Sequence, residues 1–441
     1  MQRHRTAVAA KVNLCRWLSS SLALGDKNAG AALWYLAALS WMDRGSLVTG
    51  TSMNQLSREQ LHGSRMMERE AELPSERSDE RQQRALALGL ESAASVQDRT
   101  IPLFNRGRGR GNGGTFIGVP FQEDMNGLDN ADVAFVGAPL DAGTTYRPGT
   151  RFGPDALRRI SQLSANAYNF ELGVDLHESL EMVDCGDINV MPANIEKSFD
   201  QIDKAVAYIH ERGIFPVILG GDHSIGYPDI RALSPYIDGN IGIIHFDRHS
   251  DLSEYNLDER MHGTPFFHAT NIPNAPATNL VQIGIGGWTS SRFGVKTARE
   301  RAASVITLTD IDRWGVDRVA ELALELAWKD AKAVFLSFDI DSIDPAFAPG
   351  TGTPMSGGLL PREALHMLHM VTREGLAGME LVEVAPEYDV GEITSGLGVH
   401  IILDTLATLI NAGQLGRRPD STVKADPEVE HSVDQTRPTG G

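Results

Sequence analysis

The chain contains the run Ile243-Ile244-His245-Phe246-Asp247-Arg248-His249-Ser250-Asp251, in which an apolar stretch ends in a series of acidic and imidazole side chains. The branched and aromatic residues predict a buried strand, and the polar residues begin where that strand stops. If the chain stays extended, Asp247, His249 and Asp251 project to one side, because alternate residues of a strand share a face. We therefore expect three potential metal ligands at one strand end.

Two other runs have the same form. They are Val217-Ile218-Leu219-Gly220-Gly221-Asp222-His223 and Phe335-Leu336-Ser337-Phe338-Asp339-Ile340-Asp341. Each alone could be a structural histidine or a turn cap, but the ends of parallel strands gather at one sheet edge. Four acids crowded there would repel one another, and divalent cations are the simplest compensation. The sequence therefore predicts a two-metal site whose ligands are His223, Asp247, His249, Asp251, Asp339 and Asp341.

Strand and helix patterns alternate over about 300 residues. This alternation predicts an α/β fold with a mostly parallel sheet that is covered on both faces. Strands are expected at residues 133–136, 215–219, 280–285, 304–308, 334–338 and 379–384, and helices at 194–212, 316–332, 361–374 and 394–412. The division expected is an N-terminal extension over residues 1–100, a catalytic domain over 101–415 and a loose polar tail over 416–441.

Composition narrows the possible partners and compartment. The net charge of -18 disfavours nucleic acid and anionic membrane surfaces. Two distant cysteines, Cys15 and Cys185, fit a reducing compartment, and no stretch is expected to span a bilayer. We expect a cytoplasmic protein. The first acidic residue is Asp26, so residues 1–50 resemble a transit peptide for an organelle matrix, unless the true start is near Met53.

The three metal runs, in this order, resemble the motifs of the ureohydrolases, the family of arginase and agmatinase. The similarity extends over residues 117–415 and includes Arg147-Pro148-Gly149-x-Arg151-Phe152-Gly153-Pro154 and Pro349-Gly350-Thr351-Gly352-Thr353-Pro354. It implies a three-layer α/β/α fold, a dinuclear metal centre and hydrolysis of a guanidinium group to urea and an amine. Divalent ions suit this reaction because they lower the pKa of a bound water to about 7.

The resemblance also implies roles for individual residues. Asp247 and Asp341 would bridge two ions, with His223 and Asp251 completing one ion and His249 and Asp339 the other. Asp341 would also relay a proton to the leaving amine. Two further matches are Glu383, which would pair with the substrate guanidinium, and His262, which would shuttle protons. Taken alone, Glu383 could be a strand-end salt bridge and His262 an ordinary loop histidine.

Further runs resemble the nickel-dependent guanidine hydrolases. They include the segment 279–288, which ends in Trp288, and Gly358-Leu359-Leu360-Pro361-Arg362-Glu363. They make free guanidine the first expected substrate, in a small pocket that includes Trp288. The apolar Met355 departs from that pattern and could contact a substituent, so agmatine, guanidino acids and alkylated guanidines such as metformin stay open. The role of Arg248 is undetermined.

Cofactor and assembly follow from the same resemblance. Either Ni²⁺ or Mn²⁺ is expected, because the oxygen-rich donor set with two imidazoles suits both ions. The family forms trimers and hexamers, so a homo-oligomer is expected. The alternative of another class is a non-catalytic partner subunit of a hetero-oligomer, which metal content would distinguish. His366 and His369, three residues apart on a predicted helix, are expected to form a solvated face rather than a second metal site.

Overall fold

The structure is a computed structural model, and it describes residues 92–94, 100–105, 114–288 and 292–416. The chain divides into the units Met1–Ser75 and Glu76–Gly441, and the described residues all belong to the second unit. Most of the extension expected over 1–100, and all but the first residue of the tail expected over 416–441, lie outside the described residues.

The core of the fold is a sheet of nine strands in the order β11-β10-β9-β12-β13-β8-β4-β7-β3. Neighbouring strands are parallel except at the β3 edge, where β3 pairs antiparallel with β7. The strands are β3 (Phe104–Asn105), β4 (Val133–Gly137), β7 (Met182–Ile188), β8 (Phe215–Leu219), β9 (Asn240–Phe246), β10 (Leu280–Ile285), β11 (Ser304–Thr307), β12 (Ala331–Asp339) and β13 (Gly378–Val382). Two short hairpins, β1 (Ser92–Ala94) with β2 (Thr100–Pro102) and β5 (Tyr168–Asn169) with β6 (Val174–Asp175), lie outside this sheet.

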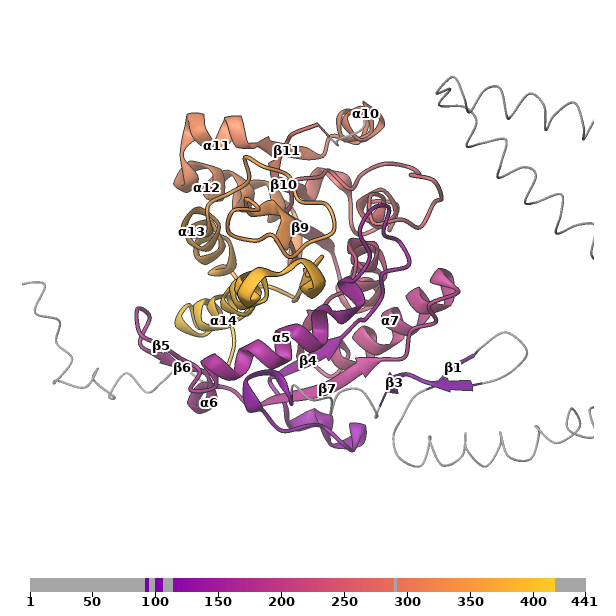
Figure 1. The fold of residues 1–441 in the computed structure, drawn as a ribbon, viewed down its shortest axis with the longest axis vertical. Helices are drawn as coiled ribbons and strands as arrows, with labels where there is room; N and C mark the ends of the chain where they lie inside the picture. The colour runs from indigo at the N-terminus through magenta and orange to yellow at the C-terminus, as the bar shows by residue number, and fades with distance from the viewer. Residues whose placement is uncertain (1–91, 95–99, 106–113, 289–291, 417–441) are drawn as a thin grey trace, which may run out of the picture. The chain divides into compact units, whose positions relative to one another are not determined.

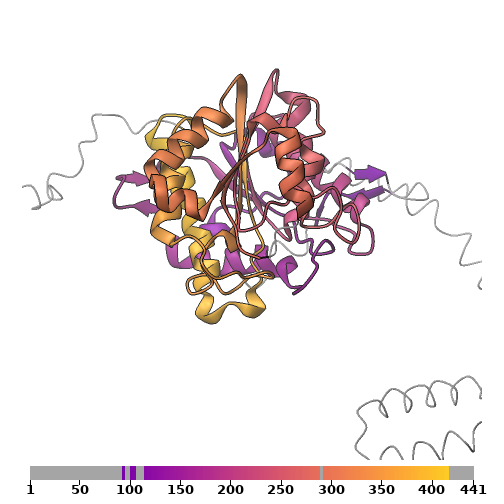
Figure 2. The same ribbon diagram turned by 90° about the horizontal axis from the view of Figure 1, so that it is seen from above.

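Helices cover both faces of the sheet, which confirms the predicted three-layer α/β/α architecture (Figures 1 and 2). One face packs against α5 (Gly153–Ser161), α6 (Leu176–Ser179), α11 (Leu308–Trp314), α12 (Val316–Ala327), α13 (Pro361–Thr372) and α14 (Ile393–Asn411). The other face packs against α7 (Ile195–His210), α8 (Gly226–Leu233), α9 (Pro265–Ala269) and α10 (Arg292–Arg301). Within β8, Val217 and Leu219 enter the first core and Ile218 enters the second, because successive strand residues face opposite sides.

Two expected boundaries differ from the structure for identifiable reasons. The helix expected to reach residue 332 ends at Ala327, because the chain turns there and Asp330 adopts a left-handed backbone (φ 56°) before β12 begins. The strand expected to reach residue 384 ends at Val382, because Glu383 is also left-handed (φ 63°). Both are positions that a regular element cannot include.

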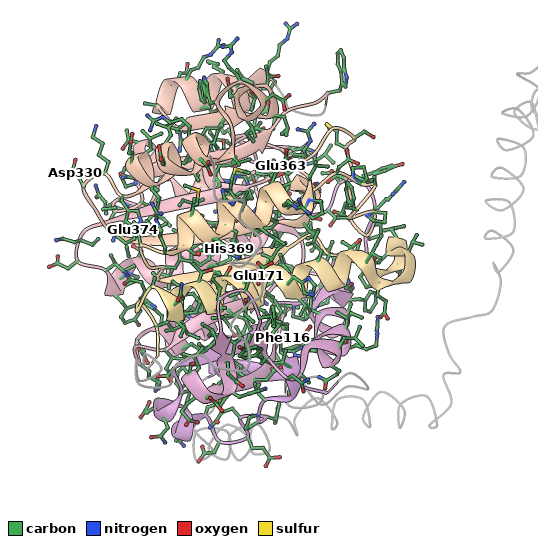
Figure 3. All side chains as sticks on the ribbon, turned by 90° about the vertical axis from the view of Figure 1, so that its left-hand side faces the viewer. Phe116, Glu171, Asp330, Glu363, His369 and Glu374 are labelled. Carbon is green, nitrogen blue, oxygen red and sulfur yellow. The ribbon has the colours of Figure 1, made fainter. Side chains whose placement is uncertain are left out.

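One helical segment meets the length and hydropathy of a membrane span, which the sequence interpretation expected no stretch to meet. Residues Val390–Asn411, which contain α14, are long and apolar enough to cross a membrane, contrary to the expectation that no stretch qualifies. However, 67% of its most apolar 18-residue stretch is buried inside the protein, since α14 packs on α5 and α13. Figure 3 shows α14 and the neighbouring α13, which carries Glu363 and His369, in the outer helical layer. The segment is therefore a core helix.

Candidate active site

Four adjacent strands in the middle of the sheet, β9-β12-β13-β8, carry the predicted site residues. The polar segments follow their carboxyl ends: Asp222–His223 after β8, Asp247–Asp251 after β9, Asp339–Asp341 at the end of β12 and Glu383 after β13. In parallel sheets this is the edge at which ligand sites form. The sequence prediction that distant runs converge at one sheet edge is met by this topology.

The approach of β8 to the site depends on two glycines. A Cβ on Gly221 would lie 1.8 Å from the Leu140 carbonyl oxygen, and a Cβ on Gly220 would lie 2.7 Å from the Leu381 carbonyl oxygen. Neither glycine has a positive φ. Their role is therefore to let neighbouring backbones approach closely, not to supply a left-handed bend. This packing places His223 beside the acidic residues that follow β9 and β12.

The six predicted ligands form two sets that share one aspartate. In the first set, His223 Nδ1 lies 3.2 Å from Asp247 Oδ2, 3.0 Å from Asp251 Oδ2 and 3.1 Å from Asp339 Oδ2. In the second set, His249 Nδ1 lies 3.3 Å from Asp247 Oδ1 and 3.0 Å from Asp341 Oδ2. The candidate ligand atoms of each set all lie within 4.8 Å of one another. Asp247 thus directs one oxygen to each set, which is the geometry of a bridging carboxylate.

The division of the other ligands between the two sets differs from the one that the family resemblance implied. Asp339 lies with His223 rather than with His249, and Asp341 belongs to the second set alone instead of bridging. The cause is the short 3₁₀ helix Ile340–Ser342. Asp339 caps it by accepting a hydrogen bond from the Asp341 N–H (2.7 Å), which leaves its other oxygen facing His223. Asp341 is carried round by the helical turn until its carboxylate faces His249.

The loop after β9 also differs from the expected extended chain. The strand ends at Phe246, and Asp251 adopts a left-handed backbone with φ 44°. Asp247, His249 and Asp251 therefore do not project to one side as alternate strand residues would. The turn at Asp251 directs its carboxylate to His223, whereas His249 faces Asp341. One loop thereby supplies ligands to both sets.

The two sets have the charge and donor chemistry that divalent cations require. Four carboxylates are buried within a few ångströms of one another. Burial and the neighbouring acids raise the pKa of Asp339 well above its ordinary value, and burial together with Asp247 outweighs the effect of His249 and raises the pKa of Asp341 to about 6. Among the described residues, His223 Nδ1 faces three carboxylate oxygens without a hydrogen-bond partner of its own. Cations coordinated by these oxygens and imidazoles would neutralise the crowded carboxylates and would give His223 Nδ1 a partner.

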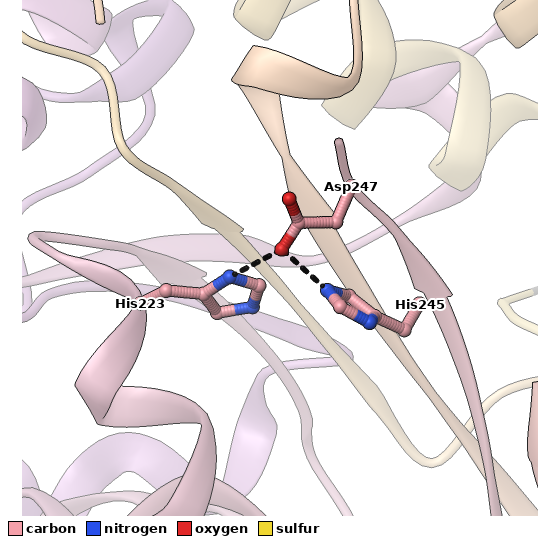
Figure 4. Close-up of side chains that lie close together, drawn as sticks. All are labelled: His223, His245 and Asp247. Atoms are coloured by element: carbon pink, nitrogen blue, oxygen red, sulfur yellow. Dashed lines mark hydrogen bonds and ion pairs between the residues drawn. The ribbon is translucent and has the colours of Figure 1, made fainter. Parts of the chain in front are cut away.

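His245, to which the sequence interpretation gave no role, positions the shared aspartate. Its Nε2 lies 2.8 Å from Asp247 Oδ2, the oxygen that also faces His223 (Figure 4). The Gln282 side-chain amide donates to His245 Nδ1 (2.9 Å), so Nε2 carries the proton and donates to Asp247. On the opposite side, His223 Nε2 lies 2.8 Å from Ser337 Oγ, which leaves Nδ1 directed at the carboxylates.

Glu383 and His262 lie together beside the metal sets. Glu383 Oε1 accepts hydrogen bonds from the His223 N–H (2.9 Å) and from His262 Nδ1 (3.0 Å). Its Oε2 is buried and has no hydrogen-bond partner in the described part of the chain. Burial acts to lower the pKa of His262, but the hydrogen bond and charge of Glu383 outweigh it and raise that pKa to about 9. His262 Nε2 lies 2.7 Å from Thr145 Oγ1.

A cavity of about 720 Å³ opens onto these groups. Glu383, His262, Asp251, Asp339 and His249 lie on its wall. The exposed part of the wall is formed by the large side chains Tyr146, Tyr255, Leu257 and Phe293 together with the polar Thr145 and Asn256. Among the described residues of the wall, Arg147 is the one lysine or arginine. A substrate that entered here would meet an acidic floor and an apolar, partly aromatic rim. Of these wall residues, only the acids and histidines were predicted from the sequence.

Two predicted substrate-binding residues lie elsewhere. Trp288 is 99% exposed, and neither it nor Met355 is among the described residues that line the cavity. Met355 instead packs against Gly287, where a Cβ would lie 1.7 Å from the Met355 sulfur. Of the two helix histidines, His366 pairs with Asp317 (2.5 Å) and His369 pairs with Asp404 (3.0 Å).

Comparison with known proteins identifies the family. The Arginase family profile matches residues 131–407. The chain is 37% identical to a mitochondrial agmatinase from Gallus gallus over 67% of this chain and 85% of that protein, and 35% identical to a human mitochondrial guanidino acid hydrolase over 66% and 81%. The solved structure of proclavaminate amidino hydrolase from Streptomyces clavuligerus superposes with a TM-score of 0.62 and 34% identity, over 67% of this chain and 97% of that one. The chain therefore belongs to the arginase family of hydrolases.

Proposed function

We propose that this protein hydrolyses a C–N bond of a guanidino compound, releasing urea and an amine. The observation that carries this proposal is the buried Glu383 Oε2, which has no partner among the described residues and lies on the cavity wall beside six metal-ligand side chains. A buried carboxylate suits a guanidinium, whose N–H groups form a planar fork. The relatives named agmatinase and guanidino acid hydrolase support the same reaction class.

The ligand roles follow from the two sets. His223, Asp247, Asp251 and Asp339 would hold one divalent ion, and Asp247, His249 and Asp341 the other. When bound, the ions would supply hydroxide near neutral pH by lowering the pKa of water. The donor set suits Mn²⁺ and Ni²⁺ alike, so the ion is decided by the assay below.

His262 and Asp341 are the proposed proton carriers. His262 holds a proton at neutral pH because Glu383 raises its pKa to about 9. It would donate the Nε2 proton to the leaving amine once Nε2 leaves its present contact with Thr145, while Glu383 keeps the ring oriented through Nδ1. Asp341, in the second set, would take the proton of the attacking water.

Two substrate classes have separate support. Free guanidine is favoured by the runs that resemble guanidine hydrolases, residues 245–249, 279–288 and 358–363. A substituted guanidine, such as agmatine, a guanidino acid or an alkylguanidine, is favoured by the cavity of about 720 Å³ and its apolar rim, because free guanidine has only four heavy atoms to fill it. The relatives' names support the second class.

Release of urea tests the proposal directly. Guanidine, agmatine, 4-guanidinobutyrate, arginine and dimethylguanidine would each be assayed with protein loaded with Mn²⁺ or with Ni²⁺. Turnover of one compound assigns the substrate class and the ion. If no compound yields urea with either ion while the protein binds both ions, hydrolysis is refuted, and a non-catalytic partner subunit becomes the better explanation.

Location and assembly complete the proposal. We propose a homo-oligomer, a trimer or hexamer, which sedimentation or light scattering would measure. We propose a cytoplasmic protein, with the matrix of an organelle as the alternative. The relatives with mitochondrial names support this alternative, and a fluorescent fusion of the full chain would distinguish the two.

A further inference from the structure

Arg248 is a buried arginine that stands in the sequence between two proposed metal ligands, Asp247 and His249. It is only 3% exposed. Its Nη1 donates to the Gly284 carbonyl (2.8 Å), and Nη2 lies 3.5 Å from the Ser356 carbonyl. Its Nε is buried without a hydrogen-bond partner, and Arg248 forms no ion pair within the described residues. A full positive charge is thus buried without a carboxylate in direct contact.

The surrounding backbone is shaped to hold this side chain. A Cβ on Gly286 would lie 2.9 Å from Arg248 Nη1, so the guanidinium occupies the space that a side chain at 286 would need. The Gly286 N–H also donates to the Arg248 carbonyl (3.1 Å). Through these contacts, Arg248 connects the loop after β9, which carries the proposed ligands Asp247 and His249, to the end of β10 and to the segment at Ser356.

The charge that compensates Arg248 is the carboxylate cluster. The Arg248 backbone N–H donates to Asp341 Oδ1 (3.3 Å), and the carboxylates whose charge acts on the guanidinium are those of Asp341, Asp247 and Asp344. An unpaired buried charge is costly unless opposite charge lies nearby. Two divalent ions would bring four positive charges to the same carboxylates. Arg248 and the ions are therefore stabilised by the same negative charge, and each weakens the attraction available to the other.

We propose that Arg248 is an internal countercharge that stabilises the folded site without metal and weakens the ion held by Asp247, His249 and Asp341. It touches no reacting atom in this proposal and is a positioning residue with an electrostatic effect. The proposal rests on the two-ion site of the proposed function. It adds that the second ion binds against a fixed positive charge and exchanges more readily than the first.

The test compares Arg248→Met, which removes the charge, with Arg248→Lys, which keeps it. Arg318→Met, at an exposed helical position, is the control for loss of an arginine. Mn²⁺ binding is titrated by calorimetry, and melting is recorded with and without the metal. For Arg248→Met we expect the weaker Kd to tighten at least about tenfold, because a unit charge acting on a divalent ion inside a protein changes a binding constant by more than one decade. The melting temperature should fall in metal-free protein only.

The outcomes separate this role from a structural one. Arg248→Lys should keep the wild-type Kd within about threefold, since the charge remains although the geometry of its hydrogen bonds changes. If Arg248→Met and Arg248→Lys weaken Mn²⁺ equally, or melt lower both with and without Mn²⁺, the residue acts through its carbonyl contacts and the proposal is refuted. Arg248→Gln replaces the Met variant if that variant does not fold. Wild-type protein that binds no Mn²⁺ would refute this proposal and the two-ion site together, whereas normal binding without urea release would refute only hydrolysis.

Discussion

Glu383→Gln is the substitution that tests the guanidinium-binding role most directly. Glutamine has nearly the same shape, so its Oε1 can still accept hydrogen bonds from the His223 N–H and His262 Nδ1, which lie 2.9 and 3.0 Å from the glutamate oxygen. The second oxygen, which has no protein partner in the described residues, becomes an NH₂ group. That group is a donor and would face the donors of the substrate. The change therefore removes one charge and reverses one hydrogen bond while the fold is kept.

The expected loss follows from the burial of the site. Removing one partner of a buried, hydrogen-bonded charge pair costs about 2–5 kcal/mol. Each 1.36 kcal/mol is about a factor of ten in rate, so kcat/KM should fall by about 30-fold to about 5,000-fold. The loss should be shared between KM and kcat, because the guanidinium carbon must be held against the nucleophile as well as bound.

The assay is steady-state urea release with the best substrate and ion from the panel, together with metal content of each variant. Glu387→Gln, at an exposed position four residues away, is the matched control and should retain wild-type kcat/KM. Glu383→Gln should keep two ions per chain. If it binds two ions and keeps kcat/KM within about threefold of wild type, Glu383 does not hold the substrate, and the reasoning from its unpaired oxygen is wrong.

Four further results are expected. Asp247→Asn should lose both ions, and Asp341→Asn only the weaker one, by metal analysis after dialysis; equal stoichiometry in both variants would argue against a shared Asp247. Chelation should destabilise the protein by about 2.7 kcal/mol for each site that was filled at a hundred times its Kd, measured by urea unfolding. His262 has a folded pKa of about 9, above its unfolded value of about 6.5, so its stabilisation is complete below pH about 6.5 and disappears as pH rises through 9. The unfolding free energies of wild type and His262→Asn should therefore converge over that interval, and a constant difference would contradict the pKa. Gly221→Ala should cost about 3 kcal/mol or more, because its Cβ would lie 1.8 Å from the Leu140 carbonyl oxygen, and a smaller loss would show that the strands can separate.

The parts of the site that the sequence predicted are those that depend on local pattern. Apolar runs ending in His223, Asp247 and Asp339 identified buried strands, and parallel strand ends meet at one edge whatever the loops do. The distribution of ligands between the two sets was not predictable in this way. It depends on the 3₁₀ turn at Ile340–Ser342, which rotates Asp341 away from Asp339, and a pattern of alternating residues does not contain that rotation.

Residues whose roles depend on distant partners were missed or misplaced. His245 orients Asp247 because Gln282, on the neighbouring strand, fixes its tautomer. Met355 was expected at the substrate, but it packs on Gly287 from a loop whose position depends on tertiary contacts. Trp288 was expected in the pocket because it ends a run that resembles related enzymes, yet it is exposed. The resemblance of a run to related enzymes predicts which residue stands at a position. The direction of that side chain depends on the residues that pack against it.

The backbone conformations of Asp251 and Glu383 indicate why this site requires the surrounding fold. Both are left-handed, at φ 44° and 63°, in a region that costs a residue other than glycine roughly 1–2 kcal/mol. A regular strand could direct only alternate residues to the cluster, and it would carry Asp251 past His223. The turn at Asp251 returns its carboxylate to His223, and the turn at Glu383 ends β13 at the cavity wall, where one oxygen is held and the other is left for a ligand. Both residues are buried, so packing rather than local preference must hold these conformations. The unfavourable backbone at Asp251 therefore allows one loop to direct carboxylates and an imidazole to both sets. The unfavourable backbone at Glu383 leaves one buried carboxylate oxygen without a partner among the described residues.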